Sequence, residues 1–467
     1  MLRGAGLVAL TAGAGLLLWL GMSSPYSLAE LCTRRRPTWI LPPFEPARYT
    51  AMSGESFVAV AVILAAVSLL VARLVRGLSG RRWAVLALWI PSAVFVGALL
   101  PGYPLLSSDI YKYVFDGRIL GVYHLNPFLH VPAEFPDDRF YDLVYWKAVV
   151  NAHGPIWRVA EAGAALAGGE SCRWSVLWMK GWSALAYLGT GALLYATIRP
   201  TSPGHAITRT ALYLWSPLVM LETAQNGHND AVAALLALGS VVLARRGRLE
   251  MAFLVLAAAA LVKPLAVVLG PLLLVAALVR PRRLVAGVSM AAVLTGVAYA
   301  PFWAGTATLQ GLSRAHIFSA SPAEALLLGL QGVGVSLDAA IPLASGAANA
   351  AFGLGALAIA WAHFQGRVDL YWGAFATMFW YGLVGAQWFN PWYLLWMMPF
   401  ACLVEDARAR VLGITFSVLA LLVYPLQYEA TAVMLAVFVP MAALVALAFR
   451  SSLLTARPRP RAAGAGT

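Results

Sequence analysis

Long apolar stretches separated by short polar breaks run along almost the whole chain. A membrane span needs roughly 20 mostly apolar residues, and about fourteen stretches meet this requirement, several of them short enough to be tilted or partly re-entrant. The bilayer core holds no water to bind a spanning backbone, so these stretches are predicted to be helices. The expected spans are 5–21, 56–75, 83–101, 174–198, 209–224, 230–244, 249–262, 264–280, 284–301, 338–362, 369–387, 391–405, 409–426 and 430–449.

The composition supports a membrane protein. Of 467 residues, 61% are apolar and 11% are charged, whereas soluble chains carry about 25% charged residues. An ordinary soluble protein, a disordered chain and a secreted disulfide scaffold are therefore excluded. The three cysteines, Cys32, Cys172 and Cys402, are too few and too scattered for a disulfide framework or a zinc cluster, and each is expected to be a small apolar packing residue. The predicted fold class is an all-α polytopic membrane protein.

The formal charge of +13 comes mostly from arginine, and in so apolar a chain it indicates membrane orientation rather than nucleic-acid binding. Arginines cluster in alternate loops, which the positive-inside rule places in the cytoplasm. Both termini are then cytoplasmic, and the long loop 102–173 faces outward. Arg34, Arg35 and Arg36 lie in the first outward loop, against this pattern. The run 5–21 is expected to be an uncleaved span, since no clear signal-peptide cleavage site follows it. The cytoplasmic arginines are Arg76, Arg81, Arg82, Arg199, Arg209, Arg245, Arg246, Arg248, Arg280, Arg282, Arg283, Arg408, Arg410, Arg457, Arg459 and Arg461.

Unusual polar motifs fall at the outer ends of the expected helices or in the outer loops. We expect these segments, which are far apart in sequence, to meet at one outer face. Almost no acidic residue lies in the middle of an expected span, whereas proton-coupled carriers usually place carboxylates near the bilayer midplane. The pattern therefore weighs against a transporter. The polar segments are 107–118, 126–136, 151–157, 225–230, 263–264, 314–316, 387–392 and 427–429.

The segment 107–118 directly follows an expected span. If it is helical, Asp109, Lys112, Tyr113 and Asp116 have the spacing of residues that share one helix face. A carboxylate at the outer bilayer surface is well placed to accept a proton from a sugar hydroxyl. Asp109 is therefore the candidate catalytic residue, and Tyr113 and Asp116 are candidate substrate-binding residues.

The same segment also has a structural interpretation. Ser107, Ser108 or Asp109 can cap the free amides of a starting helix. Asp116 can simply form an ion pair with Arg118, and this explanation is preferred for Asp116. Arg118 is otherwise a further candidate for substrate binding.

Two further parts of the outer loop predict a surface helix and a candidate binding residue. The charged and aromatic stretch 134–147 is typical of an amphipathic helix on the membrane surface, and Asn126 with Pro127 predicts the turn that precedes it. His153 precedes a Gly-Pro turn that would direct its imidazole into a neighbouring cavity. His153 is a candidate for substrate binding, although an ordinary loop histidine has the same pattern.

The densest polar run, 225–230, lies between two apolar helices. Its side chains can bind sugar hydroxyls, cap the next helix, or join Asp109 in holding a divalent ion. The spacing lacks the closed ligand set of a strong zinc signature, so no metal or other cofactor is expected, and a divalent ion remains the less supported alternative. The candidate substrate-binding residues of this run are Asn226, His228, Asn229 and Asp230.

Lys263, before Pro264, interrupts a long apolar stretch. A charge at membrane depth usually faces a polar cavity or a ligand, and an anionic lipid phosphate would supply the counter-charge. Alternatively, Lys263 extends to the outer interface at a helix hairpin. Arg314, near His316, is a second candidate for binding phosphate. Hydrogen-bonding and aromatic candidates for a sugar come from 387–392: Gln387, Asn390 and Trp392.

Together these motifs resemble the membrane-embedded glycosyltransferases of the GT-C class, and within it the bacterial mannosyltransferases that use a polyprenyl-phosphate sugar. The resemblance covers roughly residues 83 to 430 and rests on the order of 109–113, 116–118, 126–128, 153–155, 226–230, 263–264 and 390–393. It implies a GT-C-like bundle of about 12–14 transmembrane helices with a large extracytoplasmic first core loop. His153 stands where relatives often have tyrosine, so no role is carried over to it.

The resemblance also implies an activity. A hexose, expected to be mannose, is transferred with inversion from a polyprenyl-phosphate sugar to a glycan or glycolipid acceptor on the extracytoplasmic side of the cell membrane. Asp109 is the base, and Lys263 and Arg314 support the phosphate. The alternatives are a different sugar, a lipid or protein acceptor, or a flippase or carrier for lipid-linked sugars, although no inverted repeat favours a carrier.

Four regions follow from these expectations. They are N-terminal helices with an outer loop over 1–82, a catalytic module over 83–301, a C-terminal transmembrane module over 302–449 and a basic cytoplasmic tail over 450–467.

Overall fold

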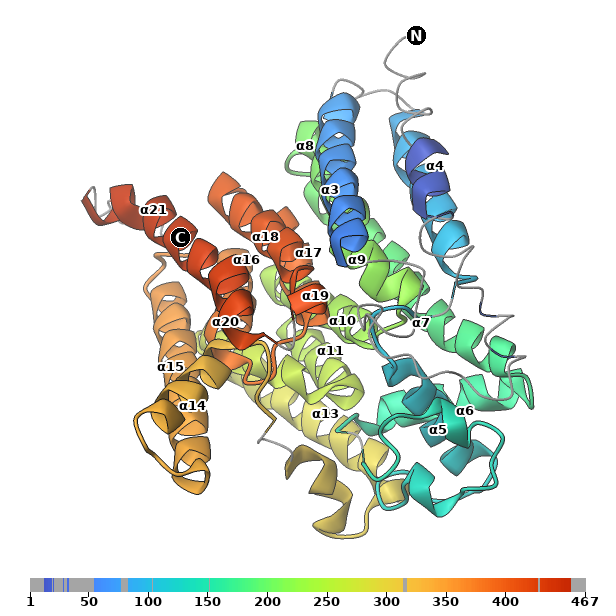
Figure 1. Ribbon diagram of the computed structural model, residues 1–467. Coiled ribbons are helices and arrows are strands. Elements are labelled where there is room, and N and C mark those ends of the chain that lie inside the picture. The colour runs from blue at the N-terminus through green and yellow to red at the C-terminus, as the bar shows by residue number, and fades with distance from the viewer. Residues whose placement is uncertain are drawn as a thin grey trace.

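The computed structural model describes residues 12–18, 20, 28, 32, 54–76, 83–102, 104–150, 152–313, 317–426 and 429–454. Within these ranges the chain forms helices joined by turns and loops, and it contains no strand (Figure 1). The predicted fold class, an all-α polytopic membrane protein, is confirmed. Arg34 to Arg36 and Arg314 to His316 lie outside the described residues.

The described α-helices are α3 Gly54–Arg76, α4 Trp83–Leu99, α5 Asp109–Gly121, α6 Pro155–Gly168, α7 Cys172–Ile198, α8 Pro203–Leu214, α9 Pro217–Met220, α10 Asp230–Arg245, α11 Leu249–Val262, α12 Gly270–Ala277, α13 Pro281–Tyr299, α14 Pro322–Gly332, α15 Leu337–Phe364, α16 Leu370–Trp380, α17 Met398–Leu403, α18 Ala407–Ala420, α19 Val423–Leu426, α20 Ala430–Val433 and α21 Val439–Leu454. Short 3-10 or π segments are η2 Pro132–Glu134, η3 Tyr141–Leu143, η4 Leu221–Gln225, η5 Pro264–Leu269, η6 Ala300–Phe302, η7 Ala307–Ser313, η8 Tyr381–Gly385, η9 Pro391–Trp396 and η10 Met434–Phe438.

Within the described ranges, four helices are long and apolar enough to cross a membrane, or five if one bent pair counts as a span. The four long helices coincide with spans expected from the sequence, as do four shorter apolar helices. The total number of spans stays a prediction. The long helices are Phe57–Val75, Pro281–Phe302, Leu337–Phe364 and Ala430–Arg450; the bent pair is Pro217–Gln225 with Asp230–Arg245; the shorter helices are Val85–Leu99, Leu249–Val262, Pro264–Ala277 and Pro391–Leu403.

Prolines explain where several expected spans break. The apolar stretch around Lys263 is interrupted as predicted, because α11 ends at Val262 and η5 begins at Pro264. The expected single span 209–224 is wrong, since α8 ends at Leu214 and α9 begins at Pro217. Proline is well suited to the first turn of a helix, where its missing N–H would have no partner anyway.

The predicted surface helix over 134–147 is also wrong. The only helical turns near it are η2 and η3, and Pro136 lacks the N–H that a continuous helix would need. Asp138 accepts hydrogen bonds from its own turn, at Phe140 N, and from Arg118 Nε, both at 2.8 Å. Such local side-chain bonds compete with helix formation.

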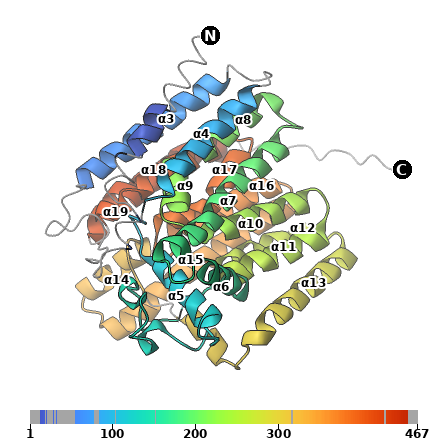
Figure 2. The same cartoon turned by 90° about the vertical axis from the view of Figure 1, so that its right-hand side faces the viewer.

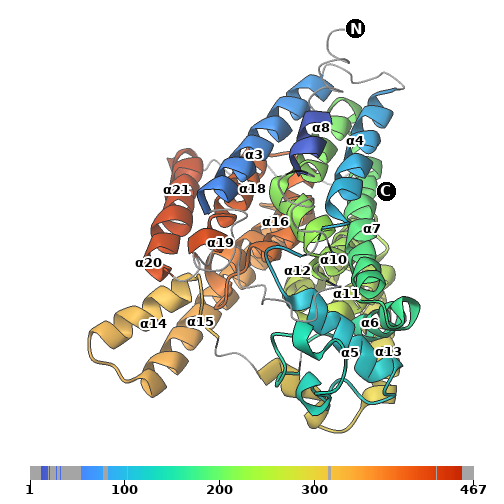
Figure 3. The same cartoon turned by 45° about the vertical axis from the view of Figure 1, so that its right-hand side comes forward.

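The polar segments of the outer loop gather at one end of the molecule. Figures 1 and 3 show α5, α6 and the connection between them at the lower end, while α3, α4 and α8 lie toward the upper end. The view in Figure 2 shows the same order of heights, with α7, α10 and α11 between the two ends. The central helices therefore form a scaffold, and α5 with α6 is added to one end of it.

The start of α6 packs very closely on the end of α11. Gly154 N donates to Val262 O at 3.2 Å, and a Cβ at Gly154 would lie only 2.2 Å from Leu261 O. Glycine is therefore required by this close approach. The contact places His153 next to Lys263, the residue that follows α11.

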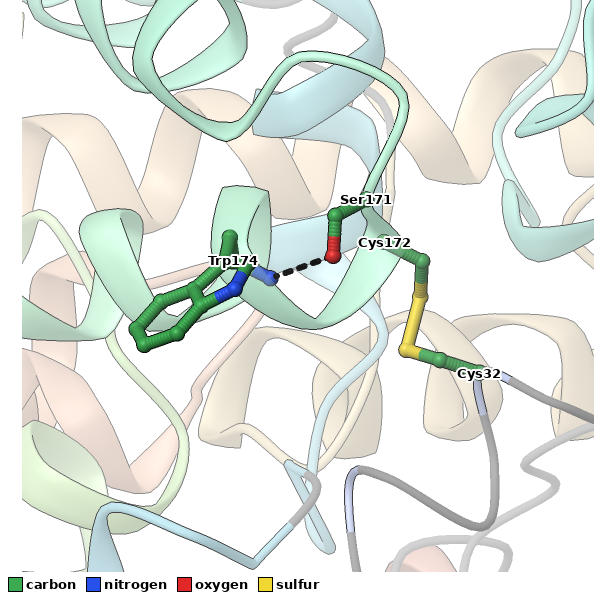
Figure 4. Close-up of a disulfide and its surroundings, with 4 residues drawn as sticks. All are labelled: Cys32, Ser171, Cys172 and Trp174. Atoms are coloured by element: carbon green, nitrogen blue, oxygen red, sulfur yellow. Dashed lines mark hydrogen bonds between the residues drawn. A yellow bond between two sulfur atoms is a disulfide. The ribbon is translucent and has the colours of Figure 1, made fainter.

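Two of the three cysteines form a disulfide, which corrects the expectation that all three are simple packing residues. Cys32 is bonded to Cys172 at the start of α7, with a Cα–Cα distance of 5.7 Å (Figure 4). Ser171, next to it, accepts a hydrogen bond from Trp174 N and caps the helix. Cys402 is a buried free thiol, as expected.

The disulfide predicts a definite thiol count. In the denatured, unreduced protein we expect one thiol, Cys402, to react with a maleimide reagent, and three after reduction, because the bonded pair has no free thiol. Mass spectrometry measures the number of adducts. The Cys402→Ser variant should show none before reduction. Three adducts on unreduced protein would contradict the bond.

Candidate active site

Two neighbouring cavities lie beside the start of α5. One has a volume of about 380 Å³ and the other about 270 Å³. The residues that line both are Asp109, Trp146, Trp388, Asn390 and Trp392. Asp109 is therefore accessible from both cavities.

The two cavities differ in charge. Asp109, Lys112 and Lys263 line the larger cavity, together with His153 and Tyr113. Among the described residues that line the smaller cavity, Asp109 alone is charged, and the rest of the wall is aromatic, apolar or hydroxyl-bearing, apart from the amide of Asn390. The larger cavity is thus suited to an anionic group and the smaller one to a neutral ligand.

Asp109 occupies the first position of α5. Its backbone N donates to Ser107 Oγ at 3.2 Å, while Ser108, the N-cap residue, makes no capping bond with its side chain. Ser107 is therefore the residue that satisfies a helix amide, and the Asp109 carboxylate faces the cavities. Burial raises the pKa of Asp109 to about 6, although Lys263 opposes this shift. The carboxyl group can both hold and release a proton near neutral pH.

Lys263 has an extended backbone, lies between α11 and η5, and lines the larger cavity. Its Nζ is 2.6 Å from Asp230 Oδ2 and 5.2 Å from the centre of the Tyr393 ring. The other Asp230 oxygen accepts a bond from Trp396 Nε1 at 2.7 Å. An ammonium has three donors, and Asp230 uses one of them. The sequence allowed two positions for this lysine, facing a polar cavity or extending to the outer interface. In the structure its side chain faces the cavity.

His153 stands on the same wall. Its ring packs edge-on against Tyr113 with centroids 5.1 Å apart, and Nδ1 is 3.6 Å from Glu161 Oε1. Burial and the nearby cations Arg158 and Lys263 hold the pKa of His153 well below its usual range. His153 is therefore neutral at pH 7 and presents an uncharged imidazole to the cavity.

Beneath this wall, α5 and α6 are joined by a buried cluster of four charged side chains: Lys112, Asp116, Arg158 and Glu161. Arg158 NH1 is 2.5 Å from Asp116 Oδ2 and 3.0 Å from Glu161 Oε2, and Lys112 contacts the other Asp116 oxygen. Asp116 is fully buried and lines neither cavity. The expected Asp116–Arg118 ion pair is wrong. Asp116 forms ion pairs with Lys112 and Arg158 instead.

Arg118 points into the outer loop. Its side chain is paired with Asp138 at 2.8 Å and Glu170 at 3.2 Å, so it ties the end of α5 to the segments on either side of α6. Asn126 has a comparable role, since Oδ1 accepts from Phe128 N at 3.0 Å and Nδ2 donates to Phe302 O at 2.8 Å. These contacts hold the loop in place.

The polar run 225–230 forms the bend, of 119°, between η4 and α10. Asn226 Oδ1 accepts from Leu105 N and Leu106 N, and Nδ2 donates to Glu222. His228 stacks on Trp392 with centroids 4.1 Å apart. Asn229 is buried, and neither Asn229 nor Asp230 caps α10 through a side-chain bond. The run supports the walls of the cavities from behind.

Gln387 also lies outside the cavity walls. Its Oε1 accepts from Ser345 Oγ at 2.9 Å and its Nε2 donates to Asn349 Oδ1 at 3.1 Å, so it binds α15. Asn390 and Trp392, from the same motif, line both cavities.

The predicted site residues thus divide into groups. Those lining a cavity are Asp109, Tyr113, His153, Lys263, Asn390 and Trp392. Those lining neither are Asp116, Arg118, Asn226, His228, Asn229, Asp230 and Gln387. Arg314 lies outside the described residues. Sequence reasoning missed Arg158, Glu161, Glu222 and Tyr424. For Arg158, Glu161 and Glu222 the available signal was a charged residue within a mostly apolar stretch of the chain.

No group of three or more His, Cys, Asp or Glu side chains positioned to bind a metal ion occurs among the described residues. The expectation that no cofactor is used stays a prediction.

A family model described as alpha-(1→6)-mannopyranosyltransferase, N-terminal domain, matches residues 11–280. The chain belongs to this family. It is therefore a membrane-bound glycosyltransferase of a mannosyltransferase family, which removes the flippase or carrier alternative. The matched range contains Asp109, His153 and Lys263, whereas Asn390 lies beyond it. No curated protein matches the chain.

The buried charge cluster predicts a strong effect of one substitution. Arg158→Met removes the cation between Asp116 and Glu161, and an uncompensated buried charge typically costs about 3–5 kcal/mol. We expect a clearly lower unfolding temperature in detergent, measured by intrinsic fluorescence. Arg139→Met is the control, because the Arg139 side chain is mostly exposed. Equal unfolding temperatures for the two variants would show that the cluster contributes little.

Proposed function

We propose that the protein transfers mannose from a polyprenyl-phosphate donor to a glycan or glycolipid acceptor on the extracytoplasmic side of the membrane. Transfer inverts the anomeric carbon, and Asp109 is the base. The observation that carries this proposal is the position of Asp109 at a wall shared by two cavities. One cavity is also lined by two lysines, and in the other no described lining residue besides Asp109 is charged.

The larger cavity suits the donor. Lys112 and Lys263 provide positive charge for a phosphate, while Pro264, Leu265, Leu312 and Ile317 give the same cavity an apolar part. A phosphate attached to an isoprenoid chain has both properties. The lipid would enter between helices from the bilayer, and the sugar would be directed toward Asp109.

The smaller cavity suits the acceptor. Trp146 and Trp388, whose ring centroids are 6.0 Å apart, offer flat surfaces for a sugar ring, and Ser108, Asn390 and Tyr424 offer hydrogen-bonding groups. Sugar sites typically combine such aromatic surfaces with a few polar groups. An acceptor hydroxyl here would lie within reach of Asp109.

The reaction then needs one displacement. Asp109 takes the proton of the acceptor hydroxyl as its oxygen attacks the anomeric carbon, and the bond from that carbon to the phosphate oxygen breaks. The phosphate leaves with the electron pair, giving a glycoside and polyprenyl phosphate. Attack opposite the leaving group inverts the anomeric centre. Because phosphate is a stable anion, the site needs cations and correct placement rather than a strong acid.

The disulfide supports the orientation of the site. Disulfides form in oxidising compartments and are rare in the cytosol. Cys172 follows α6 closely, on the loop expected to face outward, and Cys32 belongs to the first loop expected to face outward. This agrees with an extracytoplasmic site and with both termini in the cytoplasm.

The decisive experiment follows mannose from polyprenyl-phosphomannose into acceptor in membranes that contain equal amounts of each variant. Asp109→Asn should lower the rate about 10²–10⁴-fold, because it removes the general base. EDTA should leave the wild-type rate unchanged. Asp137→Asn, at an exposed position of the same loop, is the matched control. Normal turnover by Asp109→Asn would exclude Asp109 as the base.

The proposal also predicts a pH dependence. With the pKa of Asp109 at about 6, the base is ionised above pH 6 and takes up a proton as the pH falls through that value. The rate should therefore decrease on the acid side of pH 6. A pH profile of kcat/KM tests this, and an acid limb near the ordinary aspartate pKa, about 4, would contradict a buried base.

A further inference from the structure

The segment between α4 and α5 leads directly to Asp109, and two buried polar side chains bind its backbone. Lys180, in the middle of α7, is fully buried. Its Nζ donates to three carbonyl oxygens: Leu99 at 3.0 Å, Leu100 at 2.8 Å and Gly102 at 2.5 Å. These bonds use all three donors of the ammonium.

Asn226 binds the next part of the same segment. Its Oδ1 accepts from both Leu105 N and Leu106 N at 3.1 Å. Its Nδ2 donates to Glu222 Oε2 at 2.9 Å, and Glu222 Oε1 accepts from Tyr424 OH at 2.5 Å. Leu105, Leu106 and Tyr424 all line the smaller cavity. The Asn226 side chain is thus fixed by the Glu222 carboxylate through its Nδ2, and it binds two residues of the cavity wall through its Oδ1.

The glycine beside Asn226 packs against both Lys180 and the first turn of α5. Gly227, beside Asn226, has φ of +74°, and a Cβ there would lie 2.6 Å from Ile110 Cδ1 and 3.1 Å from Lys180 Cγ. Ile110 is the residue after Asp109. The bend at 225–230, the lysine of α7 and the start of α5 therefore pack together without room for an added atom.

We infer that Lys180 and Asn226 are positioning residues, which hold the segment from Leu99 to Leu106 and so place Asp109 at the wall shared by the two cavities. The inference rests on the proposed function in taking Asp109 as the base. It changes the interpretation of Asn226, which the sequence suggested as a substrate ligand, and it assigns a role to Lys180, which no motif indicated.

The physical reason is the cost of small displacements. A helix that begins at a catalytic residue has no preceding turn to fix its direction, so the incoming backbone determines where the first side chain lies. A misplacement of about 1 Å near reacting groups can cost about 10²-fold in rate. Five hydrogen bonds to backbone groups of Leu99, Leu100, Gly102, Leu105 and Leu106 restrict such displacement.

The test compares Lys180→Met and Asn226→Leu with two conservative variants, Lys180→Arg and Asn226→Asp, the latter of which keeps the acceptor for Leu105 N and Leu106 N. Ser240→Ala is the control for the loss of a buried hydrogen bond elsewhere, since Ser240 binds Ala252 O between α10 and α11. We expect kcat to fall about tenfold or more in Lys180→Met and Asn226→Leu. The KM for the donor should change much less, and Asn226→Asp should recover part of the loss.

A second readout does not depend on turnover. An Asp109→Cys variant reports the position of residue 109 through its rate of reaction with a charged methanethiosulfonate reagent, while the Cys32–Cys172 bond and buried Cys402 provide no accessible free thiol. Adding Asn226→Leu should change this rate severalfold, and adding Ser240→Ala should leave it unchanged. If Lys180→Met fails to fold, the two Asn226 variants test the positioning role by themselves.

The outcomes separate the two proposals. An unchanged reaction rate at position 109 in folded Asn226→Leu protein overturns the positioning role, even if activity is lost. Full activity of Asp109→Asn overturns the base, and the thiol measurement still decides whether Asn226 places residue 109. A fall in kcat together with a changed reaction rate at 109 supports the inference.

Discussion

Charged groups that are withdrawn from water must find partners inside the protein, and this constraint organises the end of the molecule that carries the two cavities. Arg158 lies between Asp116 and Glu161, and Lys112, which also lines the larger cavity, contacts Asp116. Because these side chains come from α5 and α6, their pairing joins the two helices. The two helices carry or border Asp109, Tyr113 and His153, so the geometry of the cavity wall depends on the pairs behind it.

A second set of contacts, centred on Asp230, joins three elements beside the larger cavity. Asp230 begins α10 and binds both Lys263, after α11, and Trp396, at the end of η9. Three elements distant in sequence therefore meet at one carboxylate. The Lys263 ammonium is held at the cavity by this carboxylate, and two of its donors are left for a ligand.

The sequence predicted the membrane class, most helix positions and the interruption at Lys263, because apolar length and proline chemistry are local properties. It also predicted that Asp109 and Lys263 share one cavity, since both follow the ends of expected spans. It did not predict the partners of Asp116 and Asn226. These partners, Arg158 and the amides of Leu105 and Leu106, are determined by packing between segments far apart in sequence. The failure over 134–147 has a local cause, as Asp138 and Pro136 disrupt a pattern that periodicity alone assigns to a helix.

The bond between Cys32 and Cys172 joins positions 140 residues apart. It closes a covalent ring that contains α3, α4, α5 and α6, and therefore Asp109 itself. A protease that cuts once inside this ring, for example in the outer segment around Asp137, leaves two pieces that remain attached to each other. The segment that carries Asp109 thus belongs to a part of the chain whose ends stay connected after a single break, until a reductant opens the bond.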